Sequence, residues 1–167
     1  TILFAYHDTK CDSYQALPAT LAATQRSFGG DGVKAIIGAG CSGASVTAAQ
    51  IAGGSHVSVI SPSSTSPALS DSGALPYFLR TIASDRFGAI AMVDVLLRLW
   101  NYTNVALVHS TDAYGAGGAE AFSDSALTTS LSIGSRQSFL KDASDFSVVY
   151  RALQRSELRV IVIFCQI

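Results

Sequence analysis

Residues 33–52 read VKAIIGAGCSGASVTAAQIA, and this stretch decides the fold. The mostly apolar residues Val33–Ile37 predict a buried strand, a turn of glycine and serine follows, and an alanine-rich helix comes after the turn. Free backbone N–H groups and the helix dipole at such a helix N-terminus favour a negative charge. The turn is therefore a candidate site for a phosphate or a carboxylate, and a turn of the same composition with no ligand is the alternative.

The same alternation of strand and helix continues on both sides of this stretch. Strands are expected at Ile2–Tyr6, Val33–Ile37, Val57–Ser61, Tyr77–Thr81, Val105–His109, Ile133–Phe139 and Val160–Cys165. Helices are expected at Tyr14–Phe28, Ser45–Gly53, Asp85–Trp100, Gly117–Thr128 and Phe146–Arg155. Strands separated by helices predict an α/β fold with parallel sheets and helices on both faces. A new series of strands after the long third helix predicts a first lobe at residues 1–100 and a second at 101–167.

Composition narrows the class of protein. The 167 residues are 49% hydrophobic and only 14% charged, which is typical of parallel sheets covered by helices. A net charge of −1 without a basic patch argues against a nucleic-acid partner. No apolar run reaches the roughly 18 residues of a membrane span, so membrane attachment is expected only through segments outside this chain. The opening on Thr1 indicates a mature chain or an excised fragment without a signal peptide.

The glycine turn also spells a dinucleotide motif. Gly38, Gly40 and Gly43 match G-x-G-x-x-G. That motif belongs after the first strand of its fold and needs an acidic residue for the ribose. Here the turn follows the second expected strand, and no acidic residue lies between Asp31 and Asp71. A nucleotide-binding enzyme is therefore only a distant alternative, and a Walker A loop is excluded because no Gly-Lys-Ser/Thr follows.

Other catalytic and metal-binding patterns are incomplete. Residues 40–44, GCSGA, lack the last glycine of a nucleophile elbow. The histidines His7, His56 and His109 have no acidic partner at a suitable spacing, and no His/Cys/Asp cluster has metal-ligand spacing. These patterns therefore predict no serine hydrolase, no metal site and no cofactor.

A second hydroxyl-rich turn, SPSSTSP at residues 61–67, follows the next expected strand. Neighbouring parallel strands would place both turns at the same carboxyl edge of the sheet, where open α/β sheets bind ligands. Hydroxyls and backbone amides there suit a carboxylate, and carbonyls with a threonine hydroxyl suit an ammonium group. Two ordinary polar loops are the alternative reading.

Several motifs together resemble one superfamily. They are DTKCD at residues 8–12, GCS at 40–42, STSPALSD at 64–71, FLRT at 78–81, SD at 84–85, AMVD at 91–94, WNY at 100–102 and YG at 114–115. In this order they resemble the type I periplasmic-binding-protein superfamily, the Venus-flytrap module of bacterial amino-acid binding proteins and of class C G-protein-coupled receptors. Residues 67–85 and the WNY step look most like metabotropic-glutamate and GABA-B ectodomains.

The resemblance implies an extracellular receptor module that binds a small amino-acid-like ligand in a cleft between two lobes and signals by lobe closure. It also implies a homo- or heterodimer through lobe 1, with the helices at 14–28 and 45–53 as candidate contacts. A receptor guanylate cyclase-type or orphan ectodomain is one alternative, and a soluble periplasmic or secreted binding protein is another. The family's first strand and helix would precede Thr1, and the second lobe would continue past Ile167.

The resemblance also implies roles for single residues. Ser42 matches the serine that holds the ligand α-carboxylate, but an extra Gly-Ala pair leaves Ser45 as the alternative. The other implied ligand contacts are Ser63, Ser64 and Thr65 for the carboxylate and ammonium, Asp85 near the ammonium, and Tyr114 closing from the second lobe.

Two covalent features complete the expectations. The family pattern implies a disulfide between Cys11 and Cys41, which leaves Cys165 as a free core thiol. Asn101-Tyr102-Thr103 is a glycosylation sequon, which gains meaning if the chain is exported.

Overall fold

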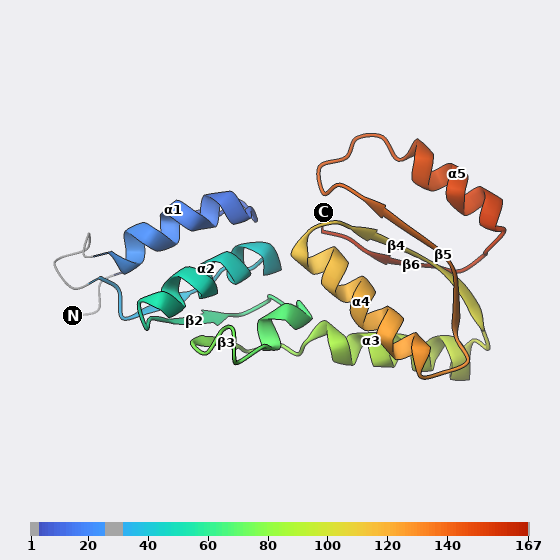
Figure 1. Cartoon of the computed structure of the whole chain (residues 1–167), viewed down its shortest axis with the longest axis horizontal. Helices are drawn as coiled ribbons and strands as arrows, with labels where there is room; N and C mark the ends of the chain where they lie inside the picture. The colour runs from blue at the N-terminus through green and yellow to red at the C-terminus, as the bar shows by residue number, and fades with distance from the viewer. Residues whose placement is uncertain (1–3, 26–31, 167) are drawn as a thin grey trace. The chain divides into compact units, whose positions relative to one another are not determined.

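The computed structural model describes residues 4–25 and 32–166 (Figure 1). The chain divides into two compact units, residues 1–83 and 84–167, and each is described by itself.

The first unit is built on a three-stranded parallel sheet of order β1-β2-β3. The strands are β1 (Ala35–Ile37), β2 (Ser58–Ser61) and β3 (Phe78–Arg80). Its helices are α1 (Ser13–Thr24), α2 (Ser42–Gly54) and the short 3-10 helix η1 (Pro67–Ser70). Helix α2 joins β1 to β2, and α1 packs against α2 beside it (Figure 1).

Small residues let the layers of the first unit approach closely. Ala48 and Ala52 of α2 are buried against Val57 and Val59, and Ala49 packs with a second group around Leu69. A helix with alanine on its inner face covers three short strands without the bulk of larger side chains. The result is a thin core that holds the carboxyl ends of β1 and β2 near the start of α2.

The second unit is a parallel sheet of order β5-β4-β6. The strands are β4 (Asn104–Ser110), β5 (Ser132–Phe139) and β6 (Ile161–Phe164). The helices are α3 (Asp85–Asp94), which continues as the π-helix η2 (Val95–Leu99), then α4 (Ala113–Leu127) and α5 (Ser147–Ser156).

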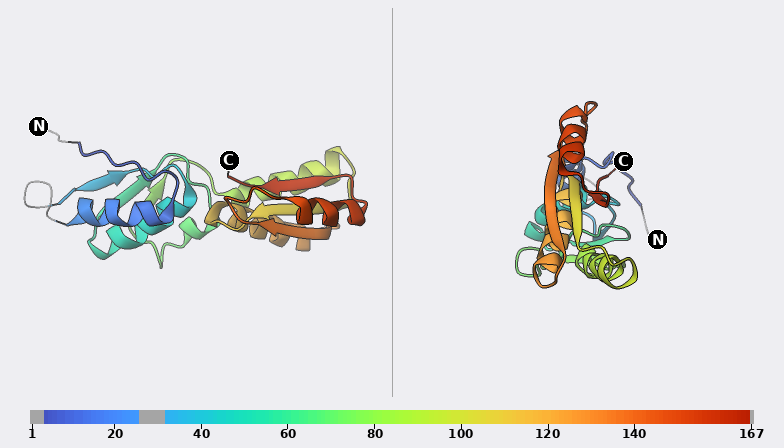
Figure 2. Two further views of the ribbon diagram at one scale, coloured as in Figure 1. Left: turned by 90° about the horizontal axis from the view of Figure 1, so that it is seen from above. Right: turned by 90° about the vertical axis from the view of Figure 1, so that its right-hand side faces the viewer.

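The strand order explains where the helices of the second unit lie. The chain crosses from β4 to β5 through α4, then back past β4 to β6 through α5. Right-handed crossovers in opposite directions put the two helices on opposite faces of the sheet, as Figure 1 and Figure 2 show. Leu107 and Phe122 are fully buried between the sheet and α4.

The predicted fold class is confirmed, because both units are parallel sheets flanked by helices. The predicted first strand is wrong for residues 4–6, which form no strand and leave Phe4 and Tyr6 exposed. A strand needs a neighbour for its backbone hydrogen bonds, and no described strand pairs with these residues. Residues 1–3 of that prediction, and residues 26–28 of the predicted helix Tyr14–Phe28, lie outside the described residues.

Two of the helices begin several residues before their predicted starts. Helix α4 begins at Ala113 rather than Gly117, because Asp112 caps it, and α2 begins at Ser42 rather than Ser45. The last strand is less buried than predicted, since Ile161 and Ile163 are exposed on the face of β6 that α5 leaves uncovered.

The two compact units divide between Ala83 and Ser84, earlier than the predicted lobe boundary at residue 100. Helix α3 joins the second unit because Ala89 and Val93 pack in the same core as Leu107 and Phe122. The lobes themselves stay a prediction.

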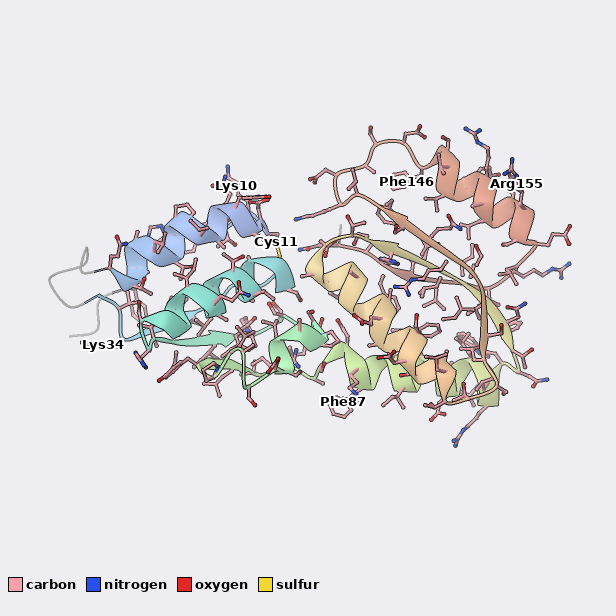
Figure 3. The ribbon with its side chains drawn as sticks, viewed as in Figure 1. Lys10, Cys11, Lys34, Phe87, Phe146 and Arg155 are labelled. Atoms are coloured by element: carbon pink, nitrogen blue, oxygen red, sulfur yellow. A yellow bond between two sulfur atoms is a disulfide. The ribbon has the colours of Figure 1, made fainter. Side chains whose placement is uncertain are left out.

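The predicted disulfide between Cys11 and Cys41 is present, with the two Cα atoms 5.2 Å apart. It ties the residue before the N-cap of α1 to the N-cap residue of α2 (Figure 3). Cys165 is a free cysteine, as predicted, but it is half-buried rather than enclosed in the core. Within the described ranges, no helix combines the length and apolar character needed to cross a membrane.

Candidate functional site

Five buried serines gather where β1 and β2 end and α2 begins. This serine cluster consists of Ser42, Ser45, Ser61, Ser64 and Ser66, each at most 2% exposed. The two hydroxyl turns predicted from the sequence therefore do meet at one edge of the sheet.

The centre of the serine cluster is the carbonyl oxygen of Ala39. It lies 3.0 Å from Ser45 Oγ, 2.6 Å from Ser61 Oγ and 3.2 Å from Ser64 Oγ. The Ser45 and Ser64 hydroxyls are also 2.7 Å apart. A carbonyl oxygen has two lone pairs and accepts two hydrogen bonds. Two of the three hydroxyls can therefore donate to Ala39, while the third donates within the pair of Ser45 and Ser64. Every hydroxyl thus has a partner without water.

Backbone N–H groups of the second turn complete the network. Ser64 N–H donates to Ser61 Oγ over 3.1 Å, and Ser66 N–H donates to Ser42 Oγ over 3.2 Å. Ser63 Oγ donates to the carbonyl of Gly40 over 2.9 Å. These bonds join the two turns to each other across more than twenty residues of chain.

Burial separates the predicted ligand contacts of this unit into two kinds. Ser42, Ser45 and Ser64 are buried, and their hydroxyls hold the turns together. Ser63 is exposed and Thr65 is half-buried, so these two side chains reach solvent at the start of α2. The first N–H groups of α2 have no partner inside the helix. Hydroxyls and helix N–H groups in this arrangement suit a carboxylate.

A second polar group lies at the carboxyl end of β4, in the other unit. Asp112 Oδ1 accepts hydrogen bonds from the N–H groups of Tyr114 (2.9 Å) and Gly115 (3.2 Å). Ser110 Oγ donates to the other carboxylate oxygen of Asp112. Burial alone would raise the pKa of Asp112, but these hydrogen bonds outweigh it and lower the pKa below its ordinary value. Asp112 therefore caps α4 as a carboxylate.

Asp112 fixes the backbone of Tyr114, the predicted second-lobe contact. Tyr114 is half-buried, and burial together with the negative charge of Asp85 and Asp112 raises the pKa of its phenol. Asp85 and Tyr114 thus lie close enough to interact, although they are far apart in the sequence. A neutral phenol beside a carboxylate can meet a ligand ammonium or donate to a ligand oxygen.

Sequence reasoning missed Ser110 and Asp112. The signal was present, because an acid or serine just before an apolar-periodic segment is a typical N-cap. His109 is 8% exposed, with Nδ1 2.9 Å from the carbonyl oxygen of Ser110. Across residues 4–25 and 32–166, no group of three or more His, Cys, Asp or Glu side chains could hold a metal ion.

Comparison with known proteins identifies the family. The family model described as "Receptor family ligand binding region" matches residues 1–167. The chain therefore belongs to the family of receptor ligand-binding regions, and the prediction of a receptor ligand-binding module rather than an enzyme is confirmed.

Similar proteins include two named as metabotropic glutamate receptors and one named as a receptor-like protein. A probable metabotropic glutamate receptor of Caenorhabditis elegans, mgl-1, is 41% identical over 91 residues, 54% of this chain. Metabotropic glutamate receptor-like protein E of Dictyostelium discoideum is 30% identical over 79% of this chain. The metabotropic glutamate receptor of Drosophila melanogaster is 30% identical over 77% of it. The matched segments span only 9%, 17% and 13% of those three relatives.

The Asp112 cap predicts a pH-dependent contribution to stability. Asp112→Ala should lower the free energy of unfolding by about 1 kcal/mol at pH 7. Because the folded-state pKa lies below the ordinary 3.8, this contribution is present above about pH 4 and is lost as the pH falls through the folded-state pKa.

The measurement is urea unfolding of both proteins at a series of pH values. Asp124→Ala, at an exposed position of the same helix, is the matched control and should change stability by less than about 0.5 kcal/mol. Equal stability of Asp112→Ala and wild type at pH 7 would contradict the capping role.

Proposed function

We propose that this chain is part of the extracellular ligand-binding module of a receptor, and that the module binds a small amino-acid-like ligand. The observation that carries the proposal is the serine cluster, which presents Ser63 and Thr65 beside the start of α2 in a chain of the receptor ligand-binding family. The names of the relatives make L-glutamate the first ligand to test.

We assign recognition of the ligand carboxylate to the serine-rich turns of the first unit and recognition of the ligand ammonium to the polar residues of the second unit. In the proposed complex the ligand carboxylate meets Ser63, Thr65 and the first N–H groups of α2. Ser42 and Ser45 are buried, so we assign them the role of ordering the turn. Ser63 is exposed, and its hydroxyl would exchange its bond to the carbonyl of Gly40 for one to the ligand. Asp85 and Tyr114 are the proposed partners of the ligand ammonium, and closure of the two lobes would bring both groups onto one ligand.

The ligand proposal predicts a loss of affinity when the accessible hydroxyls are removed. In the complete ectodomain that contains this chain, Ser63→Ala and Thr65→Ala should each weaken L-glutamate binding about tenfold. A hydrogen bond to a charged group contributes roughly 1.5–3 kcal/mol, and each 1.4 kcal/mol is a factor of about ten.

The measurement is isothermal titration calorimetry, with Ser72→Ala at an exposed turn of the same unit as the control. Titrations with a panel of other amino acids and with NAD separate ligand classes. Binding of NAD but of no amino acid would overturn the proposal in favour of the nucleotide-binding alternative.

We also propose an extracellular location, which the disulfide favours because such bonds persist in oxidising compartments. Asn101 and Thr103 of the sequon are exposed, in the loop between η2 and β4. The ectodomain secreted from a eukaryotic host should therefore lose mass on treatment with a glycan-removing amidase, and Asn101→Gln should abolish that share of the loss. An identical mass loss in Asn101→Gln would argue against a glycan at this position.

We further propose that the module dimerises through α1. Ala16, Thr20 and Ala23 are the buried face of α1, which packs against α2. Apolar side chains on the other side remain exposed: Tyr14 at 84%, Leu17 at 45% and Leu21 at 37%. Residues spaced by three and four share one helix face, so these three form a stripe that a second copy could cover.

The test is sedimentation of the complete ectodomain. Leu17→Glu with Leu21→Glu should convert dimer to monomer, whereas Val148→Glu on exposed α5 of the other unit should not. A dimer that survives the paired change would place the interface elsewhere.

A further inference from the structure

Arg80 occupies a special position beside the second hydroxyl turn. It is the last residue of β3 and pairs with Ser61, the last residue of β2, from which the turn departs. Thr81 N–H donates to the carbonyl of Ser61 over 3.1 Å, so the two strands stay paired to their ends. The half-buried Arg80 side chain therefore starts directly beside the residue where the turn begins.

The guanidinium group contacts both the turn and the short helix that follows it. Nη1 lies 3.0 Å from the carbonyl oxygen of Ser66 and 3.3 Å from that of Ser64. Nη2 donates to the hydroxyl of Ser70, at the end of η1. One planar group thus joins the turn to the short helix that follows it.

The two carbonyls that Arg80 contacts flank Thr65. Along residues 63–66 the burial alternates, with Ser64 and Ser66 fully buried, Ser63 exposed and Thr65 half-buried. The serine cluster encloses the side chains of Ser64 and Ser66, and Arg80 binds the carbonyl oxygens of the same two residues. Both sets of bonds act on Ser64 and Ser66, and together they fix the backbone of Thr65 between them and of Ser63 before them.

We infer that Arg80 is a positioning residue of the ligand site: its guanidinium holds residues 63–66 in the conformation that presents Ser63 and Thr65 to a ligand carboxylate. This inference rests on the proposed function and deepens it. Arg80 acts through the turn and does not itself touch the ligand.

The geometry requires arginine rather than any cation. A guanidinium presents several donors in a fixed plane, whereas a lysine ammonium is a single point charge on a flexible stem. Lysine at this position can reach one of the three oxygens but cannot hold all of them. If the turn then spends only about a tenth of its time in the competent conformation, the apparent affinity falls about tenfold.

The experiment compares Arg80→Lys, Arg80→Met and wild type in the complete ectodomain. L-Glutamate affinity is measured by calorimetry, and backbone hydrogen exchange of residues 62–70 is measured by mass spectrometry without ligand. Arg98→Lys, at an exposed arginine of the other unit, is the matched chemical control. Val57→Ala, in the buried core at the far end of β2, is the control for general destabilisation of the first unit.

We expect Arg80→Lys to bind about ten times more weakly, to exchange faster across residues 62–70, and to keep the protection of β4 and α4. Arg98→Lys should match wild type, and Val57→Ala should keep wild-type affinity while the protein is folded. Wild-type affinity in Arg80→Lys with a loss only in Arg80→Met would overturn the inference. The positive charge, rather than the planar set of guanidinium donors, would then be what the turn requires.

An equal loss of affinity in Val57→Ala would also overturn it, because general destabilisation would then explain the effect. If the wild-type ectodomain binds no amino acid, the proposed function fails. The exchange measurement then decides the inference by itself, since unchanged exchange of residues 62–70 in Arg80→Lys removes the positioning role and faster exchange retains it.

Discussion

The hydrogen bonds that converge on the carbonyl oxygen of Ala39 are the constraint on which the first unit depends. Three serine hydroxyls from two separate turns contact this one acceptor, and two of them also contact each other. A buried hydroxyl without a partner is costly, so the two turns are stable only when they meet. The strand order, the short β2 and the early start of α2 bring the two turns into contact.

In the second unit, a charged cap and two glycines hold the end of a strand close to the start of a helix. Asp112 caps α4 at the end of β4, and a Cβ at Gly115 would come within 2.9 Å of the backbone nitrogen of Ser110. One turn further along α4, Gly118 leaves room for the ring of Phe164. A helix can approach its strand this closely only because glycine occupies both positions. Tyr114 is therefore carried on one of the most tightly packed parts of this unit.

Local patterns predicted most of the strands and helices, because apolar periodicity and helix caps each depend on residues that are close together in the sequence. The predicted helix started at Gly117, whereas the Asp112 cap and the close packing of Gly115 against Ser110 stabilise a helix from Ala113. Phe4–Tyr6 has the composition of a strand, but strand formation depends on a neighbour that no local pattern specifies. The glycine- and serine-rich composition pointed to two turns that do lie together. It did not reveal that Ser42 and Ser45 are buried, since burial depends on how two distant turns pack.

The alternation of burial along residues 63–66 has a consequence for how this family of sites diversifies. Ser64 and Ser66 are fully buried and bonded within the serine cluster. The side chains of Ser63 and Thr65 reach solvent, and Ser63 Oγ also donates to the carbonyl of Gly40. Substitutions at the outward positions leave the anchoring hydroxyls untouched, so new recognition chemistry can be sampled there at little cost to folding. The segment thus combines, within four consecutive residues, two positions that the fold constrains and two at which recognition chemistry can change.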